Sequence, residues 1–138
     1  MAMVFSYDAG TNTGKDVPGG SIHRIIGTWE TTSGGVATEA TQKVSGKLIK
    51  AITNPGATAP TDNYDITIKD DQAFDVLTNC EDNLVDRDTT NTEEVYFLVN
   101  DDGSLGTGGS PVVNSVLTIA VANGGDTKQG VIHLYYQT

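Results

Sequence analysis

The chain has 138 residues, of which 37% are hydrophobic, and 18 acidic residues against eight lysines and arginines give a net charge of −10. This length suits one domain with a sizeable core, and the acidic charge argues against nucleic-acid binding, which requires a basic surface. The single cysteine excludes an internal disulfide, and the longest strongly apolar run, 116–122, is far too short to cross a membrane as a helix.

Composition and charge distribution favour a β protein with two unlike halves. The 16 glycines and the frequent Thr, Asn and Asp residues favour turns and strands over long helices. Residues 1–50 carry four acids and five bases, a balance of +1, whereas residues 51–138 carry 14 acids and three bases, a balance of −11. An acidic surface keeps a protein soluble; the functional alternative is that the first half docks on a partner.

The N-terminal residues 1–20 are predicted to form a flexible arm, because turn-forming Asn, Gly and Pro residues interrupt any regular element. Val4, Phe5 and Tyr7 are its main apolar side chains. Two interpretations stay open: a loose terminus, or an arm whose apolar side chains anchor on a neighbouring subunit and become ordered only in an assembly. Residues 21–138 are expected to form one antiparallel β domain. No secretory signal opens the chain, so we expect synthesis in a cytoplasm.

Alternation of apolar and polar side chains predicts most of the strands. Strands are expected at 21–32, 36–42, 43–53, 94–100, 112–123 and 129–137. Gly46, inside the third of these runs, indicates a bulge or a close approach of another backbone. The last two strands are expected to pair directly with each other as an antiparallel hairpin.

Residues 61–77 are expected to form a small hairpin around which the domain is organised. Its apolar face carries Tyr64, Ile66, Ile68, Phe74, Val76 and Leu77. A hairpin of this size is marginal alone and needs a second layer, which predicts an all-β fold, a compact antiparallel β-sandwich or β-barrel. The polar, aperiodic stretch 78–91 is predicted to be a long surface connection with one helical turn at 81–85.

No recognisable motif carries chemistry. The sequence contains no Gly-x-Ser-x-Gly elbow, phosphate loop or dinucleotide glycine pattern. His23 and His133 have no Cys or His at ligand spacing, and the acidic run 70–75 lacks the glycine that tightens a calcium loop. Cys80 is expected to be a small, buried or half-exposed thiol. We therefore expect no enzyme, and no catalytic residue, metal or cofactor.

Aromatic side chains are the main candidates for ligand contacts on any binding face. Tyr64 and Tyr136 are in phase with aliphatic neighbours, so both are expected in the core. Trp29 or Tyr135 would carry the contact if the domain stacked on a sugar.

Five segments stand in a characteristic order: HRIIGTW at 23–29, TQKVSGKLI at 41–49, APTDNYDI at 59–66, RDTTNTE at 87–93 and KQGVIHLYY at 128–136. Together they resemble small virion structural proteins of tailed bacteriophages, encoded among the head genes. The likeness covers about residues 21–137 and lies in overall order, without a catalytic motif.

The resemblance implies a capsid decoration (cement) protein that binds the outer surface of the head shell and stabilises it. Its partners would be the major capsid protein and its own copies in a homotrimer, with neither nucleic acid nor membrane. It would reside on the capsid surface of the virion after synthesis in the host cytoplasm. The candidate contacts are Val4, Phe5, Tyr7, Arg24, Lys43, Lys47 and Lys50. The alternatives are a glycan- or receptor-binding β module on the virion, or a head–tail joining protein.

Overall fold

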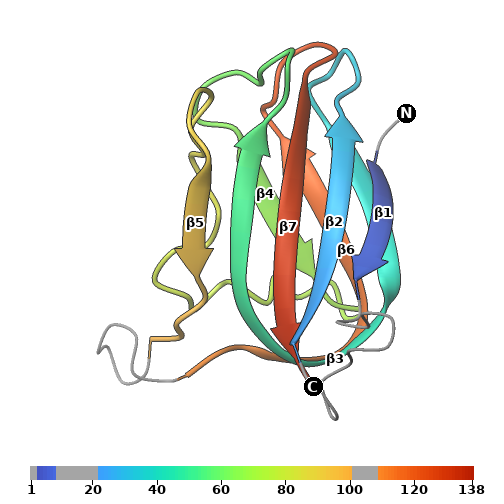
Figure 1. The fold of residues 1–138 in the computed structure, drawn as a ribbon, viewed down its shortest axis with the longest axis vertical. Coiled ribbons are helices and arrows are strands. Elements are labelled where there is room, and N and C mark those ends of the chain that lie inside the picture. Colours follow the sequence, from blue (N-terminus) through green and yellow to red (C-terminus); the bar gives the residue numbers. More distant parts are fainter. Residues whose placement is uncertain (1–2, 9–21, 101–108) are drawn as a thin grey trace, which may run out of the picture.

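Figure 1 shows the computed structural model, which describes residues 3–8, 22–100 and 109–138. Within these ranges every regular element is a strand, and the predicted all-β class is confirmed. The strands are β1 (Met3–Asp8), β2 (Ile22–Glu30), β3 (Ala37–Pro55), β4 (Asp65–Lys69), β5 (Glu93–Tyr96), β6 (Val112–Ala122) and β7 (Gln129–Gln137).

All seven strands belong to one antiparallel sheet with the order β1-β2-β7-β3-β6-β4, and β5 pairs with the remaining edge of β3. The 19-residue β3 joins two parts, because residues 37–47 pair with β6 whereas residues 47–55 pair with β7. We call β1, β2, β7, β5 and the second half of β3 the five-strand part. The first half of β3, β6 and β4 form the three-strand part. The expected sandwich or barrel is not confirmed, since the strand order does not close.

Figure 1 shows β4 and β6 behind β2 and β7, so that the sheet folds back over itself at β3. One hydrophobic core includes buried side chains from both parts. The ring of Trp29 on β2 lies 5.6 Å from the ring of Tyr64, which directly precedes β4. The apolar sets predicted from the alternation of β6 and β7 are buried: Leu117, Ile119, Val121, Ile132 and Leu134. Each such side chain contributes about 1.5–3 kcal/mol on burial, which favours the folded-back sheet.

The strand β3 changes partners at Gly46. The φ angle of Gly46 is 146°, and an added Cβ would overlap the carbonyl oxygen of Gln137. Only glycine therefore lets the end of β7 pass this close, and the predicted backbone approach is confirmed. Register shifts occur on both sides of this point. The strands predicted at 36–42 and 43–53 are one continuous, irregular strand.

The predicted hairpin between 112–123 and 129–137 is wrong. Both segments are strands, but β3 lies between β6 and β7 in the sheet order. The loop between them carries the chain from the three-strand part to the five-strand part. The physical reason is the length of β3, which offers a separate ladder to each of the two strands.

The hairpin predicted at 61–77 forms only beside its turn, where the N–H of Val76 donates to the carbonyl of Ile68 at 2.9 Å, and its return strand is not formed. β4 pairs with β6, and the segment after it touches β4 through a single bridge between Lys69 and Asp75. Asp70 explains the difference: its carboxylate accepts the backbone N–H groups of Gln72 at 2.9 Å and Phe74 at 3.0 Å. These bonds close a tight turn in place of a return strand.

The predicted arm is wrong over residues 3–8, because β1 pairs with β2 along its whole length. Met3 is buried and Phe5 packs against the core, so this strand is ordered within a single chain. The reason is that alternate apolar side chains of β1 extend the core beside β2. Residues 9–20 of the predicted arm lie outside the described residues.

Candidate functional site

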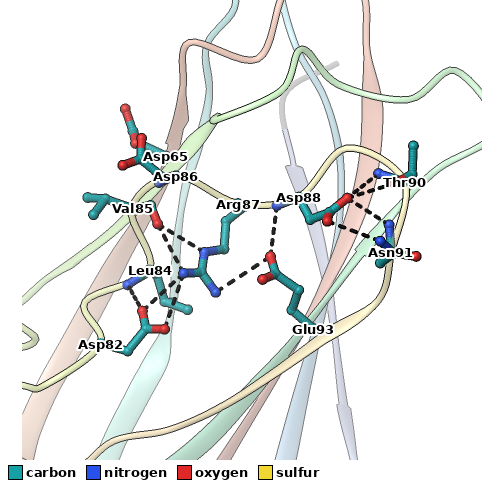
Figure 2. A network of polar contacts seen from close by, with 10 residues as sticks. All are labelled: Asp65, Asp82, Leu84, Val85, Asp86, Arg87, Asp88, Thr90, Asn91 and Glu93. Carbon is teal, nitrogen blue, oxygen red and sulfur yellow. Dashed lines mark hydrogen bonds and ion pairs between the residues drawn. The ribbon is translucent and has the colours of Figure 1, made fainter.

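A buried arginine anchors the long connection between β4 and β5 (Figure 2). One terminal nitrogen of Arg87 donates to both carboxylate oxygens of Asp82, at 3.1 and 3.2 Å, and to the carbonyl of Val85 at 3.0 Å. Its other terminal nitrogen lies 3.7 Å from Oε1 of Glu93. A guanidinium that is 6% exposed needs such partners, so the cluster serves to hold the connection in place.

Asp88 closes the turn that follows this anchor. Its carboxylate accepts the backbone N–H groups of Thr90 at 2.6 Å and Asn91 at 2.9 Å, as Figure 2 shows. These bonds, led by that from Thr90, hold the pKa of Asp88 well below its ordinary value. The carboxylate is thus committed to backbone donors and is poorly suited to bind a ligand.

The helical turn predicted at 81–85 is not formed. Leu84 has a φ angle of 66° and is buried, and its N–H donates to the carboxylate of Asp82 at 2.9 Å. Its carbonyl accepts the N–H of Ile66 at 3.0 Å, which ties the connection to β4. The short acidic side chain competes with helical hydrogen bonding, and core burial of Leu84 decides the outcome.

The candidate contacts on β1 differ in accessibility. Val4 and Tyr7 are exposed, whereas Phe5 is partly buried against the core. The hydroxyl of Tyr7 accepts the backbone N–H of Gln42 at 2.8 Å, which links β1 to the first half of β3. Phe5 and Tyr7 therefore stabilise an edge of the fold, whereas Val4 faces outward.

Lys43 and Lys47 lie on the outer face of the three-strand part. Register pairs Lys43 with Val116 and Lys47 with Val112, both on the exposed side of β6. Lys69 on β4 joins the same face across β6, although the sequence reasoning did not include it. We call these three lysines together with Val112 and Val116 the lysine face. None of the three lysines forms an ion pair with a described residue.

Arg24 and Lys50 lie instead on the outer face of the five-strand part. Register aligns Arg24 with Tyr135, Tyr135 with Lys50, and Lys50 with Tyr96 across four strands. The ammonium of Lys50 lies 5.0 Å from the ring centre of Tyr135 and 5.5 Å from that of Tyr96. It donates to Oε2 of Glu94 at 2.7 Å, and this bond raises the pKa of Lys50. The four predicted cations are therefore divided between two outer faces.

The expectation that Trp29 could stack on a sugar is wrong. Its side chain is 1% exposed, and its ring lies so close beneath Gly130 that a Cβ there would overlap it. Trp29 shares the inward side of β2 with Ile25, and the core takes that side. Tyr64 is fully buried, as expected, and burial raises its pKa to about 12. Tyr135 stays on the outer face.

The other candidate groups are accounted for by packing. Cys80 is buried, and burial raises the pKa of its thiol. His133 is half-buried on β7, and burial lowers its pKa. His23 stacks on Tyr136 with ring centres 4.9 Å apart. Among the residues that the structure describes, no group of three or more His, Cys, Asp or Glu is placed to hold a metal ion.

No model of a known protein family matches the chain, and a search of curated proteins finds no similar sequence. Across the described ranges 3–8, 22–100 and 109–138, no helix is long and apolar enough to cross a membrane. Among the described residues, the geometry offers two outward surfaces as candidate sites. They are the lysine face and the row formed by Tyr96, Lys50 and Tyr135.

Proposed function

We propose that this chain is a capsid decoration protein of a tailed bacteriophage, which docks on the outside of the head shell and stabilises it. The observation that carries the proposal is the lysine face. On a chain with a net charge of −10, three lysines share one outer face of the sheet with Val112, which is 74% exposed, and Val116. The order of sequence segments resembling phage head proteins supports the same role.

The lysine face suits an acidic, partly apolar partner surface, for which we propose the major capsid protein. Lysines that form no ion pair with a described residue keep their charge available for complementary carboxylates, and exposed valines contribute apolar area at the centre of an interface. Several copies in a homotrimer sum modest contacts into avidity. A protein that binds only the expanded shell stabilises that shell by mass action.

Charge reversal tests the docking surface. The double variant Lys43→Glu/Lys47→Glu is expected to attach to purified heads of the encoding phage at least about tenfold more weakly, equivalent to about 1.4 kcal/mol. Occupancy is measured by cosedimentation over a range of protein concentrations. The control is Lys128→Glu, which reverses the charge of a lysine on the β6–β7 loop. The occupancy of heads by this variant is expected to equal that of the original chain. Equal occupancy for the double variant would remove the lysine face as the docking side.

The number of copies per virion tests the role itself. A decoration protein is present in many copies spread over the lattice, whereas a head–tail joining protein forms a single ring. Cryo-electron microscopy of virions distinguishes the two arrangements, and light scattering of the isolated protein measures whether it is the proposed trimer. A single ring at the head–tail junction would overturn the proposal.

A further inference from the structure

We propose that the outer face of the five-strand part binds saccharide through a platform made of Tyr96, Lys50, Glu94 and Tyr135. This second site goes beyond the docking role and uses none of the residues of the lysine face. Because the sheet folds back at β3, the platform and the lysine face are outer faces of different parts of the fold. When the protein is bound to a partner through the lysine face, the platform therefore stays accessible.

The platform is built on three paired strands. Lys50 on β3 is the register partner of Tyr96 on β5 and of Tyr135 on β7, so the two rings flank one ammonium group. The ring-to-ammonium distances of 5.5 and 5.0 Å are those of cation–π contacts. The 2.7 Å bond that Lys50 donates to the Glu94 carboxylate restrains the Lys50 side chain between the rings. Sheet pairing holds the backbones of the four residues, and the Lys50–Glu94 bond restrains two of the side chains, which limits the conformational entropy lost on binding.

The chemistry of the platform matches a pyranose ring. The C–H faces of a sugar are apolar and pack on the faces of tyrosine rings, whose hydroxyls add a polar handle. Neighbouring sugar hydroxyls need a donor and an acceptor side by side. Lys50 has three N–H donors and gives one to Glu94, while Oε1 of Glu94 accepts no hydrogen bond from a described residue. Lys50 and Glu94 together can therefore bind adjacent hydroxyls.

Charge favours a neutral ligand at this position. Glu94 neutralises Lys50, and the two side chains remain 47% and 23% exposed, respectively. An anionic ligand would meet the Glu94 carboxylate, whereas a neutral sugar can use both members of the pair. Tyr96 is 52% exposed on an edge strand, which leaves room for a bulky ligand beside it. The platform thus differs from the lysine face, whose lysines form no ion pair with any described residue.

Titration of the ¹⁵N-labelled full chain with cellohexaose, maltohexaose and chitohexaose, followed by NMR, tests the inference. At least one sugar is expected to shift the amide signals of Lys50, Glu94, Tyr96 and Tyr135 with a Kd of about 1 mM. Tyr96→Ala and Glu94→Gln are each expected to weaken this binding about tenfold, and Tyr96→Phe is expected to retain it. Lys43→Ala on the lysine face is the matched control and is expected to bind like the original chain.

Two results would overturn the inference. The first is no shift at these positions with any of the three sugars up to about 10 mM, roughly tenfold above the expected Kd. The second is equal binding by Tyr96→Ala and the original chain. Far-UV circular dichroism and thermal melting show whether each variant is folded. If Tyr96→Ala does not fold, Glu94→Gln takes its place, and binding by Glu94→Gln equal to that of the original chain would overturn the inference. Attachment of Tyr96→Ala to phage heads is expected to be normal, so failure here leaves the docking proposal separately testable.

Discussion

Arg87 and Lys50 are both paired with carboxylates, yet the two pairs have different consequences. The Arg87 side chain is 6% exposed and bonds to the backbone as well as to Asp82, whereas Lys50 sits on an outer face. A buried charge that loses its partners costs several kcal/mol, whereas an exposed ion pair contributes about 0–1 kcal/mol. Arg87 therefore holds the fold together, and Lys50 remains available for a ligand.

Replacing each of these two cations by methionine compares the roles directly. Arg87→Met is expected to lower the free energy of unfolding by about 1–3 kcal/mol, because the Val85 carbonyl and the Asp82 carboxylate lose the hydrogen bonds that anchor the connection. Lys50→Met, the matched control, is expected to lower it by less than about 1 kcal/mol. Urea unfolding followed by tryptophan fluorescence measures both values. Similar losses for the two variants would contradict a structural role specific to Arg87.

Among the elements, β3 determines how the other strands are arranged. Its first half pairs with β6, and its second half lies between β7 and β5. The change of partner requires Gly46, whose missing side chain leaves space for the end of β7. Two strands adjacent in sequence, β6 and β7, are thereby separated.

Gly46→Ala is expected to destabilise the protein by about 2–4 kcal/mol, because its Cβ overlaps the backbone of Gln137 and its φ of 146° disfavours a side chain. Gly34→Ala is the control: the nearest atom to its added Cβ is Oγ1 of Thr32 at 3.7 Å. That change is expected to stay within about 0.5 kcal/mol. Urea midpoints compare the two variants, and a Gly46→Ala midpoint equal to that of Gly34→Ala would show that the junction tolerates a side chain.

At the scale of the whole molecule, the two outer faces have different electrostatic character. The lysine face carries three lysines with no described ion-pair partner, whereas the platform holds one lysine neutralised by Glu94. The attachment proposed for the first depends on attraction between exposed charges. The binding proposed for the second depends on ring stacking and hydrogen bonds, which salt affects little.

Raising the salt concentration should separate the two proposed interactions. The screening length falls from about 10 Å at 0.1 M to about 3 Å at 1 M, so attachment to heads is expected to weaken at least about tenfold over this range. The Kd for an oligosaccharide is expected to change by less than about twofold. Cosedimentation measures the first quantity and NMR titration the second. Salt-independent attachment would contradict docking through the lysine face.

Composition and alternation alone predict the fold class, most strand positions and many inward-facing residues, although Phe74, expected on the apolar face of 61–77, is 51% exposed. The alternation that places Leu117 and Ile132 in the core is local, with a period of two residues, and needs no knowledge of partners. Gly46 could likewise be identified from the sequence as a point where another backbone segment comes close. The outward placement of Lys43 also follows from alternation.

The folded structure is needed to see which strands pair, that residues 3–8 belong to the sheet, and which side of β2 is covered. Trp29 is buried because Gly130 and Tyr64 close over it, and Lys69 joins Lys43 because β6 lies between their strands. Such contacts join residues far apart in the chain. The free energy that selects these contacts comes from burying both parts of the sheet together. A local pattern of side chains does not predict which distant residues will be buried against each other.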